Sequence, residues 1–145
     1  MRIVIDTNIW VSGLLWQGLP WHLLRLSENE RITLCIAPAI IDELSRVLNY
    51  HRLQSRLAQL GLQPADLVAY VINLAALFEP QVDRKSPIVA IDPDDDIFLH
   101  CAEVAGARYV VSGDRHLLDL GHYAGIPIVT IREFLVQEFP HLKLD

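Results

Sequence analysis

The chain has 145 residues, of which 52% are hydrophobic and 21% are charged, a balance typical of globular proteins and unlike that of disordered ones. Twelve basic residues stand against eighteen acidic ones, which gives a formal net charge of −6. This charge argues against a DNA-binding protein with a broad basic face. It does not exclude an enzyme that acts on nucleic acid through metal ions, because such sites concentrate carboxylates. We expect one domain over residues 1–145.

The sequence also bears on where the protein works. No apolar run approaches the roughly 20 residues that cross a bilayer, so we expect no membrane span. Asp6 and Asn8 interrupt the N-terminus before the apolar region of a signal peptide could form. Cys35 and Cys101 both lie in apolar contexts, where cysteine packs as a small hydrophobic residue. We therefore expect unpaired cysteines and a cytoplasmic protein.

Short apolar runs alternate with helical patterns along the chain. The runs that predict strands are Ile3–Ile5, Ile32–Ile36, Tyr109–Ser112 and Ile128–Thr130. None alternates between apolar and polar residues, as expected for parallel strands that are covered on both faces. The predicted helices are 14–26 with a break near Gly18-Leu19-Pro20, 39–60 in one or two pieces, 64–78 and 92–105. This alternation predicts an α/β fold, in which ligands bind beyond the carboxyl ends of the strands.

Two acids follow predicted strands directly. Asp6 comes after Val4-Ile5, and Asp114 comes shortly after Val110-Val111. A carboxylate at the end of a buried strand is costly unless it is hydrogen-bonded, paired or bound to a metal. Each acid could equally cap the helix that follows it, since Asp is a preferred N-cap residue.

A third acid lies on the predicted helix that begins near Ala39. At about 100° per residue, its apolar residues form one stripe and Asp42 falls opposite that stripe. Glu43 falls at the edge of the stripe, where a carboxylate is less common. Glu43 is therefore the candidate of this pair, and Asp42 is expected in solvent near Arg46.

The segment Asp92-Pro93-Asp94-Asp95-Asp96 begins a fourth element. Asp92 as N-cap with Pro93 at the first helical position is a strong helix start, and the dipole of the helix favours further acids there. Phe98, Cys101, Ala102 and Ala105 form the predicted buried stripe of this helix. Asp94 and Asp95 lie on the side of that stripe, whereas Asp96 is expected to point away. Periodicity does not choose between Asp94 and Asp95.

Acids from four separate segments, each at a strand end or a helix start, could meet in one pocket. Hard divalent cations prefer oxygen ligands. Two such ions about 4 Å apart can activate water and stabilise the leaving oxygen in phosphodiester hydrolysis. This chemistry needs neither a histidine base nor a cysteine nucleophile.

The four segments resemble the motifs of PIN domains, a family of metal-dependent ribonucleases that includes many VapC-type toxins of toxin–antitoxin pairs. Ile3-Val4-Ile5-Asp6-Thr7-Asn8-Ile9 resembles the opening motif of that family. The others are similar to Pro38–Leu44 with Glu43 as the acid, Asp92–Leu99 with Ala102 and Gly106, and Val110–Asp114 followed by Leu117-Leu118. Counting back from Ala102 and Gly106 to the acid of the family selects Asp95. His116 is a departure, because relatives often carry a second acid after the fourth motif.

This resemblance implies a three-layer α/β/α fold with a parallel sheet of about five strands, the fifth near Leu77–Pro80. It implies a metal-dependent endoribonuclease in which Asp6, Glu43, Asp95 and Asp114 hold Mg²⁺ or Mn²⁺. Metal-activated water would hydrolyse RNA phosphodiester bonds, leaving a 5′-phosphate. The implied partners are an RNA substrate, an antitoxin protein and a second copy of the chain.

Two alternatives remain open. One is a catalytically silent PIN scaffold that binds RNA or a partner protein, against which the presence of all four acids argues. The other is a phosphotransfer or receiver-like α/β domain. That class pairs acids after the first strand, whereas Asp6-Thr7-Asn8 stands here.

Further residues near the predicted site are candidates for supporting roles. Asn8 and Ser112 each lie two positions from an acid and could orient Asp6 and Asp114 by hydrogen bonds, or cap local turns. Arg46 and Arg115 could contact substrate phosphates. Arg52 and Arg56 could extend a basic strip, although an ordinary solvated helix charge is the preferred interpretation for Arg56. Trp10, Trp16 and Trp21 could pack in the core or supply apolar surface to a homodimer.

Overall fold

The structure is a computed structural model, and it describes residues 1–79 and 96–143. In this part of the chain the strands form a six-stranded sheet in the order β3-β2-β1-β4-β6-β5. The strands are β1 (Arg2–Ile5), β2 (Thr33–Ile36), β3 (Ala76–Leu77), β4 (Tyr109–Val111), β5 (His122–Tyr123) and β6 (Ile126–Val129).

Five of these strands, β3, β2, β1, β4 and β6, pair in parallel, which confirms the predicted parallel sheet of about five strands. The sixth strand, β5, was not predicted and pairs antiparallel with β6. Ala124 and Gly125 join the two strands with φ values of 52° and 79°. Two consecutive positive φ values are typical of the type I′ turn that closes a tight hairpin.

Most helices lie close to where the sequence predicts them, but the first begins at Thr7, well before the predicted 14–26, and the helix over Ile131–Glu138 was not predicted. The helices are α1 (Thr7–Leu15), α2 (Leu19–Glu28), α3 (Pro38–Leu48), the 3₁₀ turn η1 (His51–Leu53), α4 (Gln54–Leu60), α5 (Pro64–Leu74), α6 (Asp96–Ala105), α7 (Arg115–Leu120) and α8 (Ile131–Glu138). The predicted break near Gly18 separates α1 from α2. The helix predicted over 64–78 is shorter, because Ala76 and Leu77 pair with Cys35 and Ile36 of β2. The predicted helix start at Asp92 lies outside the described residues.

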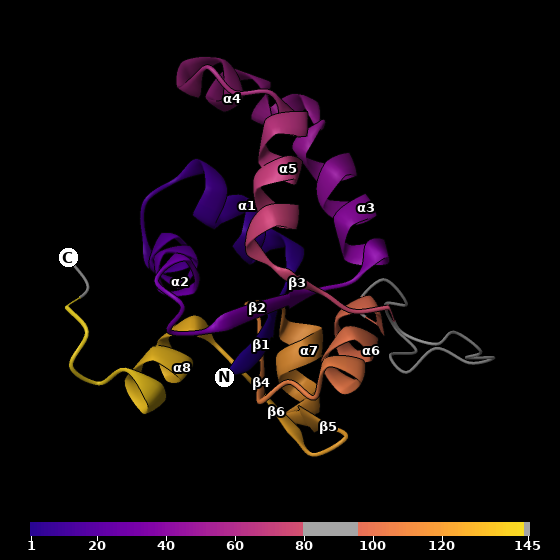
Figure 1. The fold of residues 1–145 in the computed structure, drawn as a ribbon, viewed down its shortest axis with the longest axis vertical. Coiled ribbons are helices and arrows are strands. Elements are labelled where there is room, and N and C mark those ends of the chain that lie inside the picture. The colour runs from indigo at the N-terminus through magenta and orange to yellow at the C-terminus, as the bar shows by residue number, and fades with distance from the viewer. Residues whose placement is uncertain (80–95, 144–145) are drawn as a thin grey trace.

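Both faces of the sheet are covered. In the view of Figure 1, helices α3, α4 and α5 rise above β2, whereas α6 packs against β1, β2 and β4, and α7 packs against β6. Ile3, Val4 and Ile5 of the central strand β1 are completely buried. This three-layer α/β/α arrangement explains why the strand sequences are apolar throughout.

The structure shows which of the tryptophans and cysteines lie in the core. Trp10 is completely buried, whereas Trp16 is 43% exposed. Cys35 and Cys101 are buried and unpaired, as predicted. No helix in the described ranges is long and apolar enough to span a membrane.

Candidate active site

The sheet topology brings Asp6 and Asp114 to the same edge. β1 and β4 are neighbours, and Ile5 lies opposite Val111 in the parallel register. Asp6 and Asp114 follow the carboxyl ends of β1 and β4. Neighbouring parallel strands end at the same edge of the sheet, so both acids lie at that edge. Asp6 is 5% exposed, and Asp114 is partly buried.

Both acids also cap helices, as the simpler interpretation predicted. The backbone N–H of Ile9 donates to Oδ1 of Asp6 at 2.8 Å, at the start of α1. The backbone N–H of His116 donates to Oδ1 of Asp114 at 2.7 Å, at the start of α7. These hydrogen bonds satisfy N–H groups that have no partner within the helix. Capping fixes the direction of each carboxylate and leaves further oxygen lone pairs on both.

Ser112 connects the two acids. Its hydroxyl donates to Oδ2 of Asp6 at 2.6 Å and accepts from the backbone N–H of Asp114 at 2.9 Å. The backbone N–H of Gly113 donates to the same Asp6 oxygen at 3.2 Å. Ser112 is completely buried, so its hydroxyl has no competing water. The predicted orienting hydrogen bond from Ser112 is therefore present.

Burial raises the pKa of the Asp6 carboxyl above its ordinary value, and the nearby charge of Asp114 raises it further. The hydrogen bonds from Ser112, Ile9 and Gly113 act in the opposite direction and favour the ionised form. The net result is a raised pKa, because desolvation is the largest effect. A positive charge placed between Asp6 and Asp114 would relieve both the desolvation and the repulsion.

A pocket of about 210 Å³ opens beside these acids. Its lining comes from α1 and its N-cap, the start of α2 and the loop between β4 and α7. The lining residues are Asp6, Asn8, Ile9, Ser12, Pro20, Gly113 and Asp114. Asn8 is exposed, and the structure gives it no side-chain hydrogen bond to a described residue. Its predicted orienting role remains a prediction.

Glu43 does not line this pocket, but it contacts the residue next to Asp6. The hydroxyl of Thr7, the residue after Asp6, donates to Oε2 of Glu43. Nη2 of Arg46 lies 3.5 Å from Oε1 of the same carboxylate. The side chain of Glu43 is 17% exposed, whereas Asp42 is exposed to solvent. The helical phase that selected Glu43 over Asp42 is correct.

The fourth predicted acid, Asp95, lies outside the described residues. Its neighbour Asp96 is 5% exposed, so the expectation that Asp96 points away from the buried face is wrong. The buried face of α6 includes Leu99, which the predicted stripe omitted. Residues three apart are neighbours on a helix surface, and burial of Leu99 therefore draws Asp96 toward the protein interior. Asp96 is an acid that the sequence analysis missed.

The described acids offer a partial set of oxygen donors to a metal ion. Among residues 1–79 and 96–143, no three His, Cys, Asp or Glu side chains form a group that could hold a metal. Asp6 and Asp114 do come together, and the described residues leave Oδ2 of Asp114 without a hydrogen bond. Oδ1 of Asp6 accepts a single hydrogen bond from those residues. These all-oxygen donors fit a hard divalent cation such as Mg²⁺ or Mn²⁺.

Comparison with known proteins adds an independent observation. A family model for the PIN domain matches residues 2–116. This range includes Asp6, Glu43, Asp95 and Asp114.

Two individual proteins are also similar. Part of the ribosomal RNA small subunit methyltransferase G of Geobacter sulfurreducens is 34% identical over 80 residues, which cover 54% of this chain and 37% of that protein. A chain in the crystal structure of VapBC2 from Rickettsia felis, bound to a DNA fragment from their promoter, superposes with a TM-score of 0.56 at 11% identity. That superposition covers 88% of this chain and 97% of the other, and it shows that the fold is shared.

Proposed function

Since this chain belongs to the PIN domain family, we propose that it is a metal-dependent endoribonuclease that hydrolyses RNA phosphodiester bonds as the toxin of a toxin–antitoxin pair. The observation that carries the proposal is the shared pocket of Asp6 and Asp114. The buried serine between them and the raised pKa of Asp6 support it. Perturbed carboxyls that converge in a pocket are typical of catalytic sites.

In this proposal Asp6, Glu43, Asp95 and Asp114 hold Mg²⁺ or Mn²⁺. When bound, the ion would activate water and stabilise the charge that develops on the phosphate. Asp95 lies outside the described residues, so its inclusion in the proposed metal site rests on the family motif alone. The burial of Asp96 makes it the necessary comparison in any mutational test.

The residues around the acids have separate tasks. Ser112 and the backbone N–H of Ile9 hold the two oxygens of Asp6 in place, so the carboxylate is oriented before a ligand arrives. Thr7 holds Glu43 in the same way. Arg46 has a 58% exposed side chain, and Arg115 is also exposed. Both can offer a guanidinium to the phosphates of the RNA.

The proposal includes an antitoxin protein and a second copy of the chain as partners. The likeness of the fold to a chain of VapBC2 supports this part of the proposal. Complete burial of Trp10 removes that side chain from any dimer surface and leaves Trp16 as the exposed tryptophan of α1 and its C-cap. The free cysteines support a cytoplasmic location.

Cleavage of single-stranded RNA with Mg²⁺ or Mn²⁺, against a control with EDTA, tests the proposal. We expect cleavage in the metal-containing samples and none in EDTA. Asp6→Asn should abolish cleavage, whereas Asp42→Asn, which removes an exposed acid next to Glu43, should not. Asp95→Asn should abolish it and Asp96→Asn should not; the reverse pattern would assign the metal to Asp96. RNA that is bound but never cleaved would instead identify a silent PIN scaffold.

A further inference from the structure

A stretch of the chain beyond the acid pocket is free of acids. From Leu44 to Ala65 there are three arginines, one histidine and no Asp or Glu, although the whole chain carries a net charge of −6. The stretch covers the end of α3, the turn η1 and α4. In Figure 1 these elements lead away from the sheet to the far end of the molecule. This stretch therefore forms a local positive surface on a protein whose net charge is negative.

Two aromatic rings on this surface are exposed and paired with arginines. Cζ of Arg52 lies 5.7 Å from the ring centroid of Tyr50, and Cζ of Arg56 lies 5.6 Å from the ring centroid of Trp16. Tyr50 is 38% exposed and Trp16 is 43% exposed. We call these four residues the arginine–aromatic surface. Each guanidinium restricts the motion of the ring it contacts, and part of that ring remains exposed to solvent.

Further hydrogen bonds order this surface. Nε of Arg56 donates to the backbone carbonyl of Leu15 at 2.8 Å, which fixes α4 against the end of α1. Nη1 of Arg46 donates to the hydroxyl of Tyr50 at 3.2 Å. The hydrogen bond of Arg56 makes it a packed residue and corrects its interpretation as an ordinary solvated helix charge. Ordered side chains lose less conformational entropy when a ligand binds.

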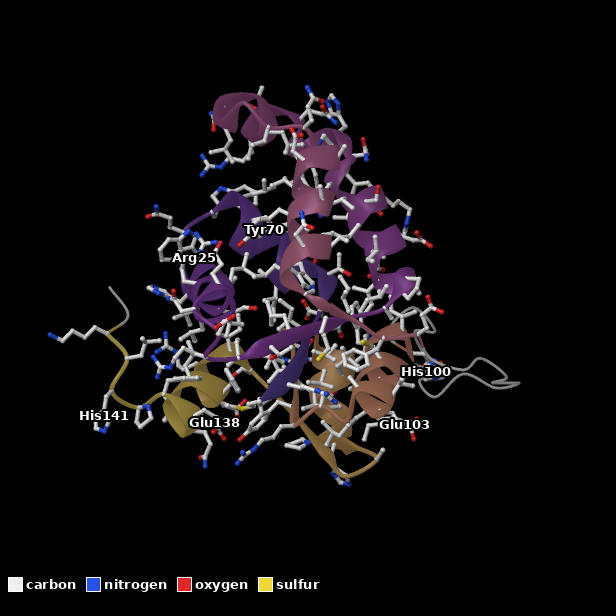
Figure 2. All side chains as sticks on the ribbon, viewed as in Figure 1. Arg25, Tyr70, His100, Glu103, Glu138 and His141 are labelled. Carbon is white, nitrogen blue, oxygen red and sulfur yellow. The ribbon has the colours of Figure 1, made fainter. Side chains whose placement is uncertain are left out.

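Figure 2 offers a contrast on the neighbouring helices. Arg25 and Tyr70 lie side by side between α2 and α5, and Nη2 of Arg25 donates to the Tyr70 hydroxyl at 3.1 Å. Glu28 neutralises this arginine at 2.9 Å and also accepts from the Tyr70 hydroxyl. No such acid contacts Arg52 or Arg56 among the described residues. Their charge is available to an anionic partner.

A chain of contacts joins this surface to the acid pocket. Thr7, next to Asp6, donates to Glu43, Arg46 contacts Glu43, and Arg46 donates to Tyr50. Tyr50 lies seven positions after Glu43 and two beyond the end of α3 at Leu48, so the two residues are separated by at most about 10 Å along the helix axis at 1.5 Å per residue. A ligand of a few nucleotides could span that distance.

We propose that the arginine–aromatic surface binds the single-stranded RNA that extends from the acid pocket, with bases stacked on Tyr50 and Trp16 and phosphates contacted by Arg52 and Arg56. This inference rests on the proposed function, because it names the strand conformation of that substrate and the path it follows. Exposed aromatic rings that each lie beside an arginine suit unstacked bases linked by phosphates. A duplex would hide its base faces and could not use the rings.

Binding can be measured separately from cleavage. The probe is a fluorescein-labelled single-stranded uridine oligonucleotide, titrated with the full chain in EDTA and followed by fluorescence anisotropy. Tyr50→Ala and Trp16→Ala should each weaken binding about 5- to 150-fold, the range seen when one stacked base is lost. Arg52→Ala should lower the slope of log affinity against log salt by about 0.7 for each phosphate contact removed. Arg132→Ala is the matched control, an exposed arginine on α8, and it should change neither quantity.

Each outcome decides the proposal. Loss of single-strand binding in the three variants, with native circular dichroism and an unchanged control, supports it. Unchanged binding in all three overturns it, as does equal binding of a duplex of the same sequence. Weakened binding of a partner protein with RNA binding intact also overturns it, by reassigning the surface to that partner. If native protein shows variant-sensitive RNA binding but no cleavage with Mn²⁺, the nuclease function fails while this surface stands.

Discussion

Ser112→Ala removes the hydroxyl that donates to Oδ2 of Asp6 at 2.6 Å and accepts from the backbone N–H of Asp114 at 2.9 Å. Hydrogen bonds to charged groups contribute about 1.5–3 kcal/mol each, and Ser112 is completely buried. We expect the variant to lose about 2 kcal/mol of unfolding free energy at neutral pH. For a chain of this size, that loss lowers the melting temperature by roughly 4–8 °C.

The pH dependence of this loss identifies its cause. The pKa of Asp6 is already raised by burial, and the Ser112 hydrogen bond holds it lower than it would otherwise be. Removing the hydroxyl raises the folded-state pKa further, which costs stability wherever Asp6 must be ionised in the folded protein. The cost is fully present above the folded-state pKa and disappears below the unfolded value. The difference in melting temperature between native and variant protein should therefore shrink as the pH is lowered through the raised pKa of Asp6 and below the unfolded value.

Thermal unfolding followed by circular dichroism across this pH range provides the measurement. Ser27→Ala is the matched control, because Ser27 is also buried and the described residues give its side chain no hydrogen bond. Its effect should not depend on pH in this window. A Ser112→Ala loss that is equal at neutral and acidic pH would show that the serine only fills space and does not act on the charge of Asp6.

Two further substitutions test the packing that positions the site. Thr7→Val removes the hydroxyl that donates to Glu43 and should lower the unfolding free energy by about 1 kcal/mol in urea denaturation; an unchanged midpoint would mean that the contact contributes nothing. Gly13→Ala would place a Cβ 2.8 Å from the Pro20 carbonyl oxygen and 2.9 Å from Leu24. It should cost about 1–3 kcal/mol in the same assay, and a native-like midpoint would contradict the close approach of α1 and α2.

The parts of the fold that follow from short-range pattern were predictable from the sequence. The strand runs and the break near Gly18 depend on residue type alone, and the position of Glu43 at the edge of a helix stripe follows from helical periodicity. The structure confirms each of them. Asp6 and Asp114 could be placed at one edge because parallel strands all end on the same side.

Other features depend on contacts that no local pattern encodes. The hydrogen bond between Thr7 and Glu43 joins residues 36 positions apart. The burial of Asp96 depends on the packing of Leu99, which the predicted stripe left out. The hairpin of β5 and β6 turns at Ala124 and Gly125. Alanine is not a residue that favours positive φ, so the turn signal was weak.

The most direct test of the metal site is the melting temperature of the protein during a titration with Mn²⁺. An ion that binds the folded state alone, at a hundredfold excess over its dissociation constant, adds about 2.7 kcal/mol, which is several degrees for this chain. We predict such a rise for the native protein and for Asp42→Asn, and a blunted rise for both Asp6→Asn and Asp114→Asn. If Mn²⁺ leaves the native melting temperature unchanged, or raises it equally in all three variants, Asp6 and Asp114 are helix caps and hold no metal.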